Sequence, residues 1–183
     1  MGDKKTTDSG ATFLESGAPK KIAIVGNPNV GKSAVFNNLT GRYANVSNYP
    51  GTTVEVYRAT AKIAGKDLEI IDTPGMYSFF PITEEERVAR KILLDEAPCV
   101  ILHVVDSKNL DRQLSLTLQL LEAGLPVILD LNISDEADRM GIKVNCQQLE
   151  KELNIPVVET VATTGKGIDR LKEIITGYVR TIC

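Results

Sequence analysis

The chain has 183 residues, the size of a single domain and too short for two domains of ordinary length. Hydrophobic residues make up 43% of it and charged residues 25%, which excludes the disordered and fibrous classes of protein. Its formal net charge of -3 gives no reason to expect nonspecific binding to nucleic acid.

The residues divide into a polar start and a periodic remainder. Residues 1–19 lack apolar periodicity, so we expect a flexible tail followed by one folded domain at residues 20–183. We expect strands at 22–25, 54–63, 68–71, 100–105, 127–131 and 156–161, and helices at 33–39, 83–94, 110–121, 146–153 and 168–179. This alternation predicts an α/β fold. Its sheet is mostly parallel and six-stranded, with one antiparallel edge hairpin and helices on both faces.

One of these segments, residues 110–121, fits two patterns. Its leucines at alternate positions are typical of a strand, but another set fits one face of a helix, namely Leu110, Leu114, Leu118 and Leu121. A helix is preferred because the segment must cross between two parallel strands.

The most specific motif is GNPNVGKS, which matches GxxxxGK[ST] in full between an expected strand and an expected helix. Its glycines let successive backbone N–H groups point at phosphate oxygens, and the following helix adds its positive dipole end. Lys32 is expected to neutralise the β and γ phosphates, and Ser33 to offer a hydroxyl to Mg²⁺. Nucleotide binding is assigned to the loop and the next residue: Gly26, Asn27, Pro28, Asn29, Val30, Gly31, Lys32, Ser33 and Ala34.

A second motif, DTPG, follows the expected strand at residues 68–71. An aspartate at the carboxyl end of a buried strand can hold Mg²⁺ through a water molecule, so Asp72 is assigned that role. The backbone N–H of Gly75 is expected to bond the γ-phosphate and so to sense it.

A third motif, NxxD, follows the expected strand at residues 127–131. Asp135 is expected to accept hydrogen bonds from N1–H and the 2-amino group of guanine. Adenine lacks this donor pair and would leave the carboxylate unpaired. Asn132 is expected to bind N7 and to brace the loop.

Together these boxes resemble the translation-factor-like (TRAFAC) small GTPases. The last box is matched by Ala162 and Thr163, whose backbone would contact guanine, although Ile133 and Val161 replace the usual lysine and serine. The stretches GNPNVGKSAVFNNLTG, NYPGTTVE, DTPGMYS and VVDSKNLDRQLSLTLQLLEAGLPV narrow the match. They are similar to the amino-terminal G domain of the FeoB family of bacterial ferrous iron transporters, and the resemblance extends from Lys21 to about Val179.

The resemblance implies slow hydrolysis of GTP to GDP and phosphate. It makes Thr53 the switch threonine that shares Mg²⁺ with Ser33, with Thr52 as the rival assignment. Met76 stands where many GTPases place a glutamine and cannot orient water, and the family offers K⁺ held partly by Asn29 instead. The catalytic assignment is therefore Lys32, Asn29, Thr53 and Gly75, with GTP or GDP, Mg²⁺ and K⁺ as ligands.

The same resemblance implies the setting of the domain. A member would continue beyond Cys183 into a helical regulatory region and membrane spans, so we expect an excised domain from the cytoplasmic face of the bacterial inner membrane. Homo-oligomerisation stays open, no nucleic-acid partner is expected, and no cluster of ligands suggests an iron site. Two alternatives remain: a soluble RNA- or ribosome-associated GTPase, and a nucleotide-sensing module with negligible turnover.

Overall fold

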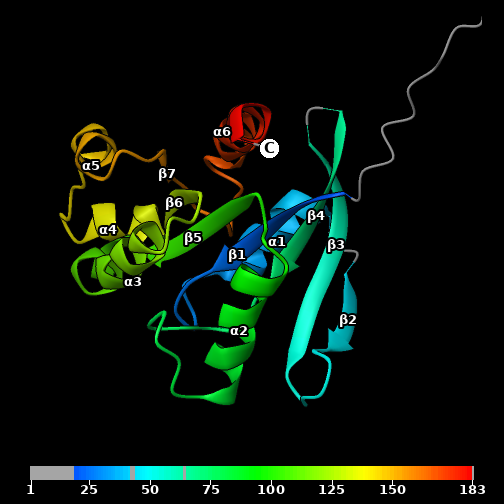
Figure 1. Cartoon of the computed structure of the whole chain (residues 1–183). Helices are drawn as coiled ribbons and strands as arrows, with labels where there is room; N and C mark the ends of the chain where they lie inside the picture. The colour runs from blue at the N-terminus through cyan, green and yellow to red at the C-terminus, as the bar shows by residue number, and fades with distance from the viewer. Residues whose placement is uncertain (1–18, 42–43, 64, 183) are drawn as a thin grey trace, which may run out of the picture.

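A computed structural model describes residues 19–41, 44–63 and 65–182, and the expected tail, apart from Pro19, lies outside them. These residues form a sheet with the strand order β2-β3-β4-β1-β5-β6-β7 (Figure 1). The strands are β1 (Lys20–Val25), β2 (Asn45–Asn48), β3 (Glu55–Ile63), β4 (Lys66–Asp72), β5 (Val100–Asp106), β6 (Val127–Asn132) and β7 (Val157–Glu159). All neighbours pair in parallel except β2 with β3 and β3 with β4.

The α/β class, the parallel centre and the edge hairpin are confirmed, but the number of strands predicted from the sequence is wrong. The sheet has seven strands in the described residues, not six, because β2 extends the hairpin edge. All four residues of β2 are exposed. A strand without a buried face carries no apolar alternation, so no pattern in the sequence signals it.

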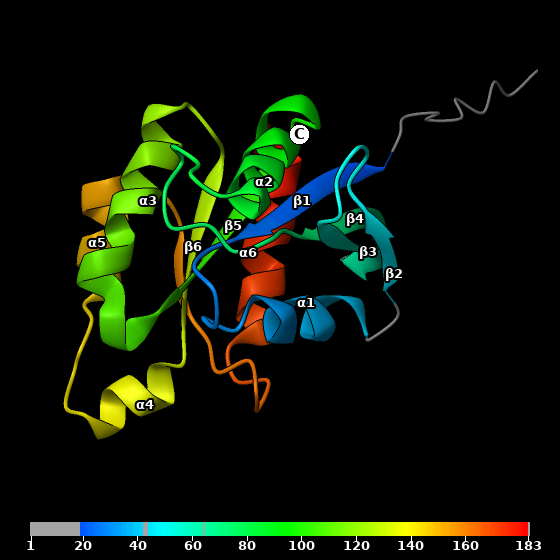
Figure 2. The same ribbon diagram turned by 90° about the horizontal axis from the view of Figure 1, so that it is seen from below.

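The helices cover both faces of the sheet. They are α1 (Lys32–Thr40), α2 (Glu84–Asp95), α3 (Leu110–Glu122), α4 (Ser134–Arg139), α5 (Cys146–Leu153) and α6 (Ile168–Ile182), with a 3₁₀ turn, η1 (Ser107–Asn109), before α3. Apolar residues of α1 and α6 share one core with the sheet, and those of α2 and α3 share the other. Figure 2 shows β1 passing between α1 and α2.

The ambiguous segment is a helix, as predicted. Three of the four leucines on the predicted face, Leu110, Leu114 and Leu121, pack partly buried against the core, but the fully buried positions lie beside them. Leu116 and Leu120 are fully buried, whereas Leu118 is 49% exposed. The buried stripe also contains Gln113 and Thr117, which find polar partners inside the protein. A pattern built on leucines alone could not include these two polar positions.

The carboxyl ends of the parallel strands meet at one edge of the sheet. The chain leaves β1, builds β3 and β4 on one side of it, and then crosses to β5 on the other side. Ligands of open α/β sheets bind where the strand order reverses in this way, outside the carboxyl ends. The loops after β1, β4 and β6 carry the three motifs and reach this edge, so the fold brings them together.

Candidate nucleotide site

The loop between β1 and α1 is shaped for close backbone approach. Gly26 has φ 150° and Gly31 has φ 93°, which favour glycine. A Cβ at Gly26 would lie 2.2 Å from the carbonyl oxygen of Val104, and one at Gly31 would lie 2.2 Å from Nδ2 of Asn132. Only glycine fits at either position, and the loop leads directly into the amino-terminal end of α1.

Lys32 holds its ammonium group inside this loop. Its Nζ donates a hydrogen bond of 2.9 Å to the carbonyl oxygen of Asn27, and the residue is only 8% exposed. Burial lowers the pKa of Lys32, while the nearby Asp72 carboxylate partly opposes that shift. A buried cation with one backbone partner is placed to exchange that partner for a phosphate oxygen.

Ser33 and Asp72 meet, although 39 positions separate them in sequence. The Ser33 hydroxyl donates a 2.7 Å hydrogen bond to Oδ2 of Asp72, at the end of β4. Burial raises the pKa of Asp72, with the Ser33 bond and Lys32 acting in the opposite direction. Its Oδ1 is buried and has no hydrogen-bond partner among the described residues. This pair of hard oxygen donors fits Mg²⁺, which prefers such ligands.

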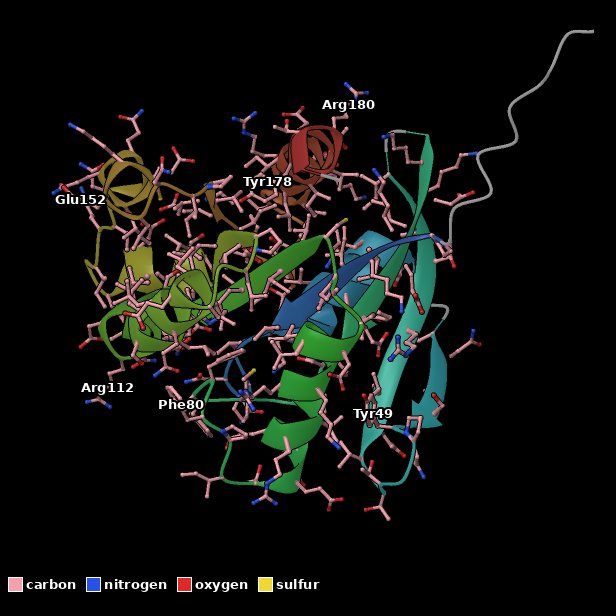
Figure 3. The ribbon with its side chains drawn as sticks, viewed as in Figure 1. Tyr49, Phe80, Arg112, Glu152, Tyr178 and Arg180 are labelled. Atoms are coloured by element: carbon pink, nitrogen blue, oxygen red, sulfur yellow. The ribbon has the colours of Figure 1, made fainter. Side chains whose placement is uncertain are left out.

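The two candidate switch threonines differ in their bonds. The Thr52 hydroxyl donates to the carbonyl oxygen of Tyr49 at 2.9 Å and accepts from the Val54 N–H at 3.2 Å, so it belongs to a tight turn. Thr53 is exposed, and its hydroxyl bonds none of the described residues. Figure 3 labels Tyr49 in this loop between β2 and β3. The geometry therefore favours Thr53 as the residue with a hydroxyl to offer.

The loop after β4 packs directly on the loop between β1 and α1, residues 26–31, hereafter the phosphate loop. A Cβ at Gly75 would lie 2.7 Å from Cγ of Pro28, and the Met76 N–H donates to the carbonyl oxygen of Gly26 at 3.1 Å. Met76 is fully buried in the core under α2. Its side chain fills the core instead of facing a ligand.

Two residues that the sequence analysis did not assign hold the rest of this loop. Oε1 of Glu86 accepts the Tyr77 N–H, and Oε2 accepts the N–H groups of Ile82 and Thr83, at 3.0, 2.8 and 3.3 Å. These backbone bonds lower the pKa of Glu86, those from Tyr77 and Ile82 most. Gln119 of α3 accepts the Phe79 N–H at 2.7 Å. Thr83 and Glu86 form a capping box at the start of α2, a pattern that can be seen in the sequence, whereas the bond of Glu86 to Tyr77 has no such signal.

The same loop presents apolar side chains to the outside. Tyr77 is 62% exposed, Phe80 72% and Ile82 82%. Figure 3 labels Phe80 in the segment that precedes α2.

Asn132 connects the phosphate loop to the two loops expected to hold the base. Its Nδ2 donates to the Val30 carbonyl oxygen at 2.9 Å. Its Oδ1 accepts the Ala162 N–H at 3.0 Å and the Thr160 hydroxyl at 3.1 Å. The residue is 2% exposed. The bracing role predicted for it is therefore visible, and N7 binding stays a prediction.

The expected base-binding residues lie around this asparagine. Asp135, in the first turn of α4, is partly exposed and forms an ion pair with Arg139. Ile133 has φ 61°, an uncommon conformation for a β-branched residue. The turn that it makes lets Asn132 point inward while α4 begins at Ser134. Thr163 is exposed beside the buried Ala162.

Asn38 is a further residue that the motifs did not reveal. Its Nδ2 donates a hydrogen bond of 2.7 Å to the carbonyl oxygen of Ala162 and one of 2.8 Å to the carbonyl oxygen of Ala34. It fixes the last box against α1 from the opposite side to Asn132. A single asparagine on a helix carries no sequence signal for such a contact.

Comparisons with known proteins agree on one family. Residues 20–175 match the family model described as Ferrous iron transport protein B. A Porphyromonas gingivalis protein, described as an Fe(2+) transport protein A/Fe(2+) transporter FeoB fusion protein, is 43% identical over 82% of this chain and 18% of its own length. The cytosolic domain of T. maritima FeoB in a GDP form has a TM-score of 0.85 and 40% identity, covering 90% of this chain and 65% of that one. The FeoB G-domain from Methanococcus jannaschii has a TM-score of 0.78 and 36% identity, covering 88% and 98%.

The chain spans between 18% and 25% of the length of the first curated relatives that it matches. Within the described ranges, no helix combines the length and the apolarity needed to cross a membrane.

Proposed function

The chain belongs to the ferrous iron transport protein B family, and from that premise we propose that it is a GTP-binding and GTP-hydrolysing switch domain. One observation carries the proposal: a buried lysine in a glycine-bounded loop lies beside a serine–aspartate pair, and Asn132 ties that loop to the expected base loops. Phosphate, Mg²⁺ and base sites therefore share one edge of the sheet.

The phosphate end of the nucleotide would replace internal bonds of the phosphate loop. The Lys32 ammonium would leave the Asn27 carbonyl for β and γ phosphate oxygens, and backbone N–H groups from Gly26 to Ala34 would surround them. Mg²⁺ would be held by the hydroxyls of Ser33 and Thr53, with Asp72 acting through water. When bound, the ion supplies positive charge next to the phosphates.

The guanine base would be bound by α4 and by the loop that contains Ala162 and Thr163. The Asp135 carboxylate would exchange Arg139 for the N1–H and 2-amino donors of guanine. Asn132 would bind N7, and the backbone at Ala162 and Thr163 would line the base. Specificity for guanine over adenine follows because an unmatched carboxylate is costly.

Hydrolysis needs a charge stabiliser because Met76 is buried and cannot orient water. Asn29 has φ 64° and is exposed, and its side chain bonds none of the described residues. It is thus free to help hold K⁺ near the phosphates, which would supply charge where it builds up in the transition state. Gly75 would report the γ-phosphate, because it packs against Pro28 of the phosphate loop.

In the whole protein, the loops that contain Thr53 and Gly75 would change with the bound nucleotide. They would report its state to a helical regulatory region and to a membrane iron channel at the cytoplasmic face of the bacterial inner membrane. The apolar side chains exposed next to Gly75 support a partner that reads this loop. The buried Met76 favours one competing function, a nucleotide-sensing module with negligible turnover. A single-turnover assay separates the two.

The test measures binding and hydrolysis with GTP, GDP and ATP in K⁺ and in Na⁺. We expect binding of GTP and GDP but not ATP, and faster phosphate release in K⁺. Asn29→Ala should abolish the difference between the salts, whereas Asn45→Ala, on exposed β2, should preserve it. Equal rates in both salts for the unaltered chain would refute the K⁺ assignment. ATP binding as tight as GTP binding would refute the guanine site.

A further inference from the structure

A carboxyl group lies fully buried in the sheet directly below the expected base site. Asp130, in β6, pairs across the sheet with Val104 of β5 and Val158 of β7, which are both apolar. Its Oδ1 lies 2.7 Å from the hydroxyl oxygen of Thr160, and its Oδ2 is buried without a hydrogen-bond partner among the described residues. An ionised carboxylate with one neutral partner in such a place is costly.

The environment of Asp130 favours the neutral acid. Burial raises its pKa to about 7, and the only opposing influence is the hydrogen bond from Thr160. No charged side chain of the described residues contributes to the shift. His103 lies in the neighbouring strand, but its ring bonds Thr117 of α3, and burial lowers its pKa to about 3, so it stays neutral.

The hydrogen bonds around Thr160 require the same protonation state. The orientation of the Asn132 amide is fixed, because Nδ2 must face the Val30 carbonyl and Oδ1 must face the Ala162 N–H. The Thr160 hydroxyl, 3.1 Å from that Oδ1, can therefore bond Asn132 only by donating.

Thr160 has one proton and two neighbouring acceptors when Asp130 is ionised. The proton then goes to the carboxylate, and the lone pairs of Thr160 face Oδ1 of Asn132. When Asp130 is protonated, it donates to Thr160, which donates to Asn132, and each contact becomes a hydrogen bond. Only the neutral acid completes the chain of bonds.

We propose that Asp130 is a positioning residue: as the neutral acid it orders Asn132 through Thr160, and its ionisation loosens the base loops and speeds release of guanine nucleotide. This inference rests on the proposed function, because it takes Asn132 and its neighbours to be the guanine site. It adds to that function a dependence of nucleotide retention on pH. The dependence comes from a residue that touches no ligand.

The experiment measures the dissociation rate of a fluorescent GDP from the 183-residue chain between about pH 5.5 and about pH 8.5. The rate for the unaltered chain should rise about fivefold with pH, the equivalent of one hydrogen bond. Asp130→Asn should lack this rise, because its amide donates to Thr160 and cannot titrate. Asp138→Asn, at an exposed position in α4, is the matched control and should keep the original profile.

The outcomes separate this inference from the proposed function. Failure to bind GDP at any pH would overturn the proposed function and the inference together. If GDP binds but its dissociation rate does not change with pH, or rises with pH equally in Asp130→Asn, the inference alone is overturned. The GDP phosphates titrate identically in both proteins, so only the difference between profiles counts. If Asp130→Asn does not fold, the infrared band of the protonated acid in the unaltered chain provides the test. This band must disappear over the pH range in which dissociation accelerates. Midpoints of these two changes that differ by more than about one pH unit would overturn the inference.

Discussion

Replacing Asn132 with alanine tests whether one side chain holds the phosphate and base loops together. The substitution removes the partners of the Val30 carbonyl and the Ala162 N–H, in residues that are 3% and 5% exposed. A buried polar group without a partner costs about 1–3 kcal/mol, so the two groups together should lower the free energy of unfolding by about 2–6 kcal/mol. That is a large share of the roughly 5–15 kcal/mol by which folded domains are stable.

Urea denaturation of the nucleotide-free chain measures this loss, with Asn45→Ala as the control. Asn45 lies in the exposed strand β2, so its replacement should change stability by less than about 0.5 kcal/mol. GDP affinity should fall with Asn132→Ala even where the protein is still folded, because both loops lose their common anchor. A loss of stability below about 1 kcal/mol with unchanged affinity would refute the view that Asn132 is that anchor.

Two further substitutions test the base and the switch loop. Asp135→Asn replaces an acceptor with a donor, so it should weaken GDP binding at least about a hundredfold and strengthen binding of xanthine nucleotide, measured by titration calorimetry; unchanged GDP affinity would contradict this. Glu86→Gln should lower the free energy of unfolding by about 1–2 kcal/mol at neutral pH, while Glu85→Gln, exposed in the same turn, should not. The native pKa of Glu86 lies below its usual value, so its stabilisation is present above about pH 4.5 and is lost as pH falls through the native pKa. The difference in the free energy of unfolding between Glu86→Gln and the unaltered chain should therefore disappear in acid. A difference that does not depend on pH would contradict the stabilising role of the Glu86 carboxylate.

The sequence was sufficient where the relevant residues are contiguous. GNPNVGKS contains its own glycines, lysine and hydroxyl, and its place between a strand and a helix follows from local periodicity. The α3 segment was placed correctly because a crossover needs a helix, but its buried face includes Gln113 and Thr117, whose partners lie elsewhere in the fold. Strand β2 has no buried face and so left no pattern.

The sequence was insufficient where the site depends on bonds between distant loops. Val30 and Asn132 are 102 positions apart, and Asn38 and Ala162 are 124 apart. Neither pair can be inferred before the order of the strands is known. The choice between Thr52 and Thr53 was open for a related reason. It depends on which hydroxyl the turn at Tyr49 uses, a matter of local geometry and not of residue type.

Strand order also changes what the NxxD motif means. The pattern NxxD alone also occurs in many capped turns. Ile133 replaces the usual lysine, which makes the match to the GTPase motif less specific. In the fold, β5 separates β6 from β1, so a side chain leaving the end of β6 can reach the loop after β1 across the edge of the sheet. Asn132 does so and bonds that loop at Val30. Asp130, two residues earlier and therefore on the same face of β6, reaches Asn132 through Thr160. The strand that leads into the expected base loop thus also carries the group proposed to loosen it, so a change in protonation inside the sheet should be felt at a bound nucleotide.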